Sequence, residues 1–197
     1  MSHGCSLVVL VGGRSRRMGQ DKAGLSAGEA TLLEHIVRRL APVVDEVIIA
    51  GGAPMDRTAA RVVADRYPGA GPLAGMHAGL RAATAAHAWV VACDLPDIEP
   101  ALGSLLLRHA AGVDAVVPRV DGKPQGLCAI YDVRLVSRIE RLLDLGERRV
   151  AGLLAASSVR YLESADLGEV DPALRSFRNL NTPADYAAWL SSRSASG

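Results

Sequence analysis

The sequence lacks the segments and residue patterns that mark membrane, secreted and zinc-binding proteins. No apolar run approaches the roughly 20 residues that a membrane-spanning helix needs. The stretch from Met1 to Ser6 is too short and polar for a signal peptide. Its 3 cysteines are odd in number and have no CxxC spacing, so neither a disulfide framework nor a zinc site is indicated. We therefore expect a cytoplasmic protein with reduced cysteines, two of them in strands.

An excess of charge of one sign is also missing. The 22 basic residues balance 21 acidic ones, which leaves a net charge of +1. Such a chain has no general attraction for nucleic acid or for an anionic membrane surface, so we expect neither as a partner. Any site for an anion must be local.

Lysine is scarce, because only Lys22 and Lys123 are lysines among the 22 basic residues. The lysine ammonium is a compact point charge that reaches into a phosphate cluster where a planar guanidinium fits badly. Both lysines are therefore candidates for phosphate contacts, although chance would also account for so small a number.

What the chain does contain is a regular alternation of strand and helix patterns. Its 197 residues, 49% of them apolar, suit one globular domain spanning residues 1–197. Short apolar runs and helical periodicity predict strands at 6–11, 46–50, 61–64, 89–93, 113–117 and 127–131, and helices at 31–40, from about 73, and at 101–110, 134–143 and 184–190. The alternation predicts an α/β fold, a Rossmann-like three-layer sandwich with a mainly parallel sheet. Ligands of such folds gather at the carboxyl ends of the strands, where Gly12, Asp65 and Asp94 fall.

The most informative stretch runs from Leu10 to Lys22 and reads LVGGRSRRMGQDK. Glycines let backbone amides approach a phosphate and form an anion-binding concavity, which Gly12 and Gly13 would provide. Arg17 and Lys22 would then neutralise a polyphosphate. The spacing matches neither a Walker A motif nor GxGxxG, which argues against a P-loop ATPase or an NAD enzyme. A tight turn followed by a solvated arginine loop is the alternative.

A second glycine-rich stretch, YPGAGPLAG, opens the helix that begins near residue 73. The helix N-terminus has unpaired amides and a positive dipole end, so Gly71, Pro72 and Leu73 could face a base or a phosphate. Asp65, just before this stretch, is the candidate to recognise a base edge. Taken alone, the stretch favours a structural turn over a binding site.

Asp94 is delivered by the apolar strand of the segment WVVACDLP. Burying a carboxylate there without a partner would be costly. Magnesium takes one or two carboxylates together with substrate phosphates, so Asp94 is the candidate metal ligand. An N-cap for a helix that begins at Pro96 is the alternative.

Two polar segments farther along could hold a second anionic substrate, and each could equally be a solvated turn: a loop at 119–125, which contains Lys123, and the stretch 146–149, which opens another helix. Thr182 is expected to cap the helix that begins at Pro183. The five histidines show no metal-binding spacing and are interpreted as structural. The acceptor candidates are Lys123, Gln125, Arg148, Arg149, Asn179 and Asn181.

Taken in order along almost the whole chain, these motifs resemble those of the molybdenum cofactor guanylyltransferases, the MobA-like group of the GT-A type nucleotidyltransferases. The family opens on a pattern similar to LAGGxSxRMGxDK, and GPLAG, CDxP, GERR and NxNTP follow in the same order. The resemblance implies an enzyme that transfers GMP from Mg-GTP to the terminal phosphate of molybdopterin and releases pyrophosphate. It also implies molybdoenzymes or other cofactor-assembly proteins as partners.

The resemblance also implies roles for individual residues. The nucleotide-binding role falls on Leu10, Val11, Gly12, Lys22 and Asp65, and the magnesium role on Asp94. Two departures from the family pattern are visible: Val11 replaces the usual alanine, and Ala50 stands where some relatives have a base-contacting asparagine.

Two other functions fit the same motifs. One is a related nucleotidyltransferase that uses CTP or another acceptor, although Gly13 favours guanine because cytidylyltransferase relatives look like LAAG at this turn. The other is a non-catalytic nucleotide-binding carrier of the cofactor, against which the presence of both Lys22 and Asp94 argues.

Overall fold

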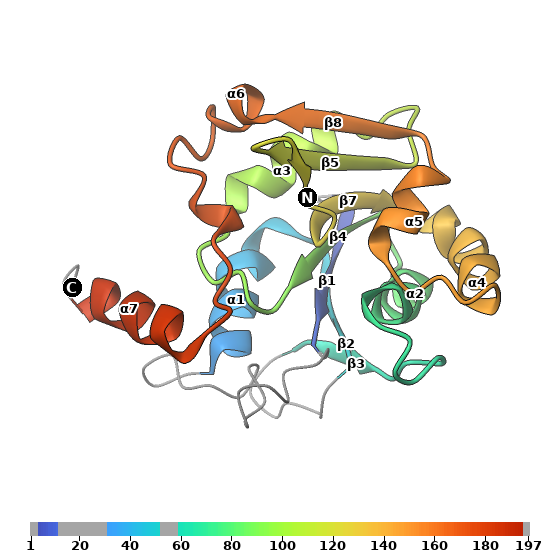
Figure 1. Ribbon diagram of the computed structural model, residues 1–197, viewed down its shortest axis with the longest axis horizontal. Coiled ribbons are helices and arrows are strands. Elements are labelled where there is room, and N and C mark those ends of the chain that lie inside the picture. Colours follow the sequence, from blue (N-terminus) through green and yellow to red (C-terminus); the bar gives the residue numbers. More distant parts are fainter. Residues whose placement is uncertain (1–3, 12–30, 52–58, 195–197) are drawn as a thin grey trace.

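The structure is a computed structural model that describes residues 4–11, 31–51 and 59–194. Within these residues eight strands form one sheet (Figure 1). Seven of them follow the order β3-β2-β1-β4-β7-β5-β6, and β8 pairs with β5 on the side away from β6 and β7. The strands are β1 (Cys5–Leu10), β2 (Glu46–Ala50), β3 (Arg61–Val63), β4 (His87–Ala92), β5 (Ala115–Val120), β6 (Lys123–Pro124), β7 (Cys128–Asp132) and β8 (Val159–Glu163).

Most of the sheet is parallel. Parallel pairing joins β3 to β2, β2 to β1, β1 to β4, and β5 to β8. Only β7 and β6 run against their neighbours, and because β7 is antiparallel to both β4 and β5, those two strands share one direction. The expected mainly parallel α/β sheet is confirmed.

Helices cover both faces of the sheet, which gives three layers (Figure 1). Residues of α1, α3 and α7 pack on one face, and residues of α2, α4 and α5 pack on the other. The helices are α1 (Leu32–Leu40), α2 (Pro72–Ala82), α3 (Pro100–Arg108), α4 (Val136–Asp144), α5 (Val150–Ala155), α6 (Ser164–Leu167) and α7 (Pro183–Ser194), with short 3-10 turns at Ala41–Val43, Val133–Leu135 and Arg175–Phe177.

Strand β1 shows why the sequence reads as a continuous apolar run. Leu7 and Val9 lie in the core under α1 and α3, whereas Val8 and Leu10 lie in the core under α2. Because both faces of a central parallel strand are covered, apolar residues are needed at every position.

Helix α1 begins and packs as its sequence predicts. Thr31 accepts a hydrogen bond from the Glu34 N–H at 3.2 Å, and the Glu34 carboxylate accepts one from the Thr31 N–H at 2.7 Å, which completes a capping box. All five of its apolar residues are buried, namely Leu32, Leu33, Ile36, Val37 and Leu40.

Three local expectations are wrong. No helix begins at Pro96, because α3 starts at Pro100 with Glu99 as its N-cap. The strand expected at 113–117 instead spans Ala115–Val120, since pairing with β6 and β8 carries it through Pro118. The segment around Lys123, expected as a loop, contains strand β6.

Two further expectations concern cysteines and membrane helices. Cys5 and Cys128 lie in strands and Cys93 follows β4, and all three are free thiols. Among the described residues, no helix combines the length and apolar character that crossing a membrane requires.

Candidate functional site

The candidate site lies at the carboxyl ends of β1, β3 and β4, which meet at one edge of the sheet because the three strands run in one direction (Figure 1). Backbone hydrogen bonds fix the end of β1 between its neighbours. The Val11 N–H donates to the Ala50 carbonyl at 2.9 Å, and the Cys93 N–H donates to the Leu10 carbonyl at 3.2 Å. The chain leaves β1 from this edge.

The valine at position 11 contributes to the core. Its side chain is buried in the core under α1 and α3, together with Leu33 and Leu95. The two methyl groups that distinguish valine from alanine therefore add to the core packing beneath the edge.

Asp94 lies two residues beyond β4 and carries a buried oxygen, Oδ1, without a hydrogen-bond partner among the described residues. Its backbone carbonyl accepts a hydrogen bond from the Leu180 N–H at 2.9 Å. The alternative role as a helix cap is wrong, since the nearest helix begins at Pro100 and has Glu99 at its cap. A buried carboxylate oxygen without a partner is costly to keep, which is typical of a group that awaits a ligand.

Asp65 follows β3 in the same way and lies against the first turns of α2. Its Oδ1 is buried without a partner among the described residues. A Cβ built on Gly75 would lie 3.9 Å from this oxygen and 3.3 Å from Leu10 Cδ2, so Asp65, α2 and the end of β1 adjoin. Burial raises the pKa of Asp65, and the nearby His77 opposes that rise.

The start of α2 is shaped by a glycine that another residue would replace poorly. Gly71, the N-cap, has φ of 75° and ψ of −166°, a region open essentially to glycine alone. A Cβ there would also lie 3.2 Å from the Arg148 carbonyl oxygen. Pro72 takes the first helical position and Leu73 is buried beneath it. The GPLAG and GERR segments therefore touch.

The two arginines of the GERR segment differ in their partners. The Glu147 carboxylate accepts hydrogen bonds from the N–H groups of Arg148 at 2.9 Å and Arg149 at 3.0 Å, and it pairs with Arg149 Nε at 3.1 Å. The Arg149 side chain and these amides lower the pKa of Glu147 to about 2. The charge of Arg149 is thus balanced, whereas the Arg148 guanidinium has no ion pair among the residues that the structure describes.

Lys123 and Gln125 lie in a hairpin whose later part, at Leu127, reaches the end of β4. The Ala92 N–H donates to the Leu127 carbonyl at 2.9 Å, and the Gln125 side chain donates to the Lys123 carbonyl at 3.2 Å. Lys123 itself is exposed and pairs in register with Val120. Gln125 thus lies nearer than Lys123, along the chain, to the Leu127 carbonyl that bonds to the end of β4.

Asn179 and Asn181 flank Leu180 and are exposed, so the backbone bond from Leu180 to Asp94 brings both asparagines to the candidate edge. Thr182 caps α7 as expected, because its hydroxyl accepts a hydrogen bond from the Asp185 N–H at 3.1 Å. Gly12, Gly13, Arg17 and Lys22 lie outside the described residues.

The residues at this edge are compatible with a magnesium ion that takes one carboxylate ligand from the protein. Within the described ranges, no group of three or more His, Cys, Asp or Glu side chains could hold a metal ion. Magnesium needs no such group, because it takes one or two carboxylates and completes its shell with water and phosphate oxygens. Asp94 Oδ1, which has no partner within the described ranges, suits that role.

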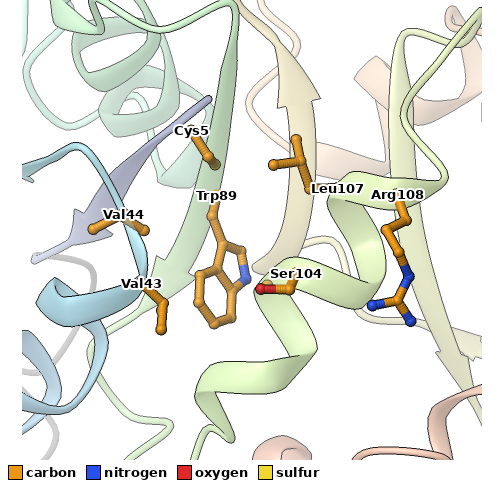
Figure 2. Close-up of a pocket in the computed structure, with 8 residues that line it drawn as sticks. Cys5, Val43, Val44, Trp89, Ser104, Leu107 and Arg108 are labelled. Carbon is orange, nitrogen blue, oxygen red and sulfur yellow. The ribbon is translucent and has the colours of Figure 1, made fainter. Parts of the chain in front are cut away.

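A separate cavity of about 300 Å³ lies at the opposite end of the strands (Figure 2). Cys5, at the start of β1, and Val44, just before β2, line it together with Trp89, Leu107 and other residues. Burial raises the pKa of the Cys5 thiol to about 12, so the thiol stays neutral. This cavity is therefore not part of the candidate site.

Known proteins are similar to this chain along most of its length. The family model for the MobA-like NTP transferase domain matches residues 7–161. A probable molybdenum cofactor guanylyltransferase of Pelotomaculum thermopropionicum is 38% identical over 180 residues, which cover 90% of this chain and 88% of that protein. A protein of the same description from Mycobacterium avium is 38% identical over 194 residues, covering 94% and 95% of the two chains.

A solved structure is similar over nearly the full length. The crystal structure of molybdopterin-guanine dinucleotide biosynthesis protein A from Archaeoglobus fulgidus has a TM-score of 0.83 and 29% sequence identity, with 96% of this chain and 99% of that chain covered. The family match, the relatives and the shared fold lead to one conclusion. The chain belongs to the MobA-like NTP transferase family and is a nucleotidyltransferase.

Proposed function

We propose that this protein transfers GMP from GTP to the terminal phosphate of molybdopterin and releases pyrophosphate. The observation that carries the proposal is a buried carboxylate oxygen of Asp94 that has no partner among the described residues. It lies at the carboxyl end of β4, beside the point where the chain leaves β1. In a nucleotidyltransferase, this is the edge where a nucleoside triphosphate is expected to bind.

The reaction needs no nucleophile from the protein. A terminal phosphate oxygen of molybdopterin attacks the α-phosphorus of GTP, the bond between the α-phosphorus and its bridging oxygen breaks, and pyrophosphate leaves with the electron pair. Both substrates are anions that repel each other, so the protein contributes alignment and opposing charge. We assign the opposing charge to Arg17 and Lys22 and the approach of backbone amides to Gly12 and Gly13.

Base and metal recognition fall to the two strand-end carboxylates. Asp65, whose oxygen against α2 has no partner in the described part of the chain, would accept hydrogen bonds from guanine. Gly71, Pro72 and Leu73, at the start of α2, and Leu10 and Val11, at the end of β1, would contribute backbone to the nucleotide site. Asp94 would hold magnesium, which when bound neutralises charge on the phosphates.

Molybdopterin would bind beside the nucleotide, against the polar segments that converge on this edge. Arg148 is the stronger acceptor-binding candidate, because Glu147 already balances the charge of Arg149. Gln125, Asn179 and Asn181 would contribute hydrogen bonds. Lys123, farther along its hairpin, would contribute charge at longer range.

The deciding experiment is pyrophosphate release from Mg-GTP, Mg-ATP, Mg-CTP and Mg-UTP, each with and without molybdopterin. We expect turnover with GTP that depends on molybdopterin and on magnesium. Faster turnover with CTP would contradict guanylyl transfer. Nucleotide binding without any turnover would instead indicate a cofactor carrier, which would receive or deliver molybdopterin among molybdoenzymes and assembly proteins.

A further inference from the structure

The short segment that carries Asp65 is anchored by the two residues that follow it. Arg66 Nη1 lies 3.3 Å from Glu140 Oε1 of α4. The Tyr67 ring meets the His77 ring of α2 edge-on, with 5.4 Å between the ring centroids. Both anchors end on the same pair of side chains, His77 and Glu140.

His77 and Glu140 are joined directly. His77 is completely buried, and its Nε2 lies 2.9 Å from Glu140 Oε1. The other ring nitrogen, Nδ1, has no partner among the described residues. An apolar side chain would fill this position in α2 without leaving a buried polar atom unsatisfied, so packing alone gives a poor account of a histidine here.

We propose that His77 and Glu140 are positioning residues that hold the Asp65 carboxylate for recognition of a purine that carries both an N1–H and a 2-amino group. This inference rests on the proposed function and names the group that fixes its base specificity. The two donors of guanine's edge match the two oxygens of one carboxylate, and Asp65 Oδ1 is unpartnered among the described residues. Hypoxanthine, which lacks the 2-amino group, would leave one oxygen unmatched.

Electrostatics support the same arrangement. Recognition of two N–H donors requires the ionised carboxylate. Burial raises the pKa of Asp65 and so disfavours the ionised form, whereas His77 lowers that pKa. The other charged or titratable groups around His77 are Arg66 and Tyr67 beyond β3, Arg81 of α2, and Glu140 and Asp144 of α4.

Binding of GTP and ITP without molybdopterin tests the proposal, with titration calorimetry as the readout from pH 5 to pH 8. ITP is the triphosphate of the hypoxanthine nucleoside. In His77→Phe, which keeps a ring against Tyr67, we expect the Kd for GTP to rise about tenfold and the preference for GTP over ITP to fall toward one. The loss of GTP affinity at acid pH should also begin at a higher pH, because the pKa of Asp65 is no longer lowered. His77→Gln, which can still donate to Glu140, should recover part of the preference.

Glu140→Gln provides a second test at a partly exposed position, should His77→Phe fold poorly. It should lower the preference for GTP over ITP in the same direction. The matched control is Arg138→Gln, at a position on the same helix as Glu140. It breaks a 2.7 Å ion pair between Arg138 and Asp114 and should leave the preference for GTP over ITP unchanged.

Three results would overturn the inference. These are an unchanged GTP:ITP preference in folded His77→Phe and Glu140→Gln, an equal change in Arg138→Gln, or a wild-type preference for GTP that survives in Asp65→Asn. Failure of the proposed function is distinguishable, because it would appear as wild-type protein that binds or uses another nucleotide better than GTP.

Discussion

Carboxylates lie at both edges of the parallel sheet, and two at the carboxyl-terminal edge differ in their hydrogen bonding from those at the amino-terminal edge. At the amino-terminal edge, Glu46 accepts hydrogen bonds from Ser6 and Thr84, and Asp114 accepts them from Ser158 and Arg138. At the carboxyl edge, Asp65 and Asp94 each keep a buried oxygen without a partner among the described residues.

The pKa shifts follow the same division. The Ser158 amide and the Arg138 side chain lower the pKa of Asp114, and hydrogen bonds from Thr84 and Ser6 lower that of Glu46 although burial opposes them. Burial raises the pKa of Asp65 instead. Glu46 and Asp114 at the amino edge therefore join strands and loops, whereas Asp65 and Asp94 at the carboxyl edge each have an oxygen that the proposed ligands would complete.

The largest effect is expected from Asp94→Asn. The substitution keeps the shape and removes the charge, so loss of charge stabilisation on the phosphates should slow turnover by roughly two to three decades. The melting temperature should stay close to that of the wild type, because no described residue bonds to Oδ1. Turnover with GTP and molybdopterin across a magnesium titration, beside a melting curve, measures both. Wild-type turnover at ordinary magnesium would remove Asp94 from the mechanism.

Glu46→Ala should do the reverse at the amino edge. It removes an acceptor that serves the Ser6 hydroxyl and the Thr84 amide, so the free energy of unfolding should fall by about 3 kcal/mol, with GTP turnover retained. Because the pKa of Glu46 is lowered below 4.5, its stabilisation is present above that pH and is lost as the pH falls through the folded-state value. Urea unfolding at pH 7 and pH 3 measures this. A variant with normal stability and lost activity would show that Glu46 serves activity rather than stability, which would contradict the proposed difference between the two edges.

Gly71→Ala should combine a smaller loss of stability with weaker GTP binding. The strained backbone costs about 1 to 2 kcal/mol, and the new Cβ presses on the Arg148 carbonyl. The control is Gly112→Ala, since Gly112 has φ of +78° but open space around its Cβ position. Comparable GTP affinity in the two variants would show that the start of α2 does not take part in the nucleotide site.

The smallest effect on stability is expected from Asp65→Asn, which should raise the melting temperature at pH 7. A folded-state pKa above the unfolded value means that the ionised carboxylate penalises folding at neutral pH. The penalty, and with it the advantage of asparagine, should shrink as the pH falls toward the ordinary aspartate value of 3.8. Melting curves at several pH values follow this trend. A destabilised variant would mean that Asp65 belongs with the satisfied carboxylates.

Sequence reasoning placed Asp65 and Asp94 at one edge because each follows a short apolar run, and parallel strands end together. It missed β8, whose residues include Arg160 and Glu163 and in which only Leu162 is fully buried. That segment is a strand because it pairs in parallel with β5. The local sequence of β8 contains no pattern that predicts this pairing.

Other contacts at the site were equally hidden from the sequence. The hydrogen bond from the Leu180 amide to the Asp94 carbonyl joins backbone groups, so no residue type in the sequence predicts it. The pairing of His77 with Glu140 depends on how α2 and α4 pack, and the histidine spacing gave no sign of it. That residues 1–197 form a single domain, and that Gly12, Gly13, Arg17 and Lys22 bind phosphates, stay predictions.

The hydrogen bond from Leu180 to Asp94 also bears on how the protein is made. Synthesis proceeds from the N-terminus, so β1, β3 and β4 emerge long before the segment that reaches back to the Asp94 turn. The sheet can begin to assemble while that turn still lacks its last backbone partner. In a nascent chain the strands that position Asp94 can thus pair before the Leu180 amide bonds to its carbonyl.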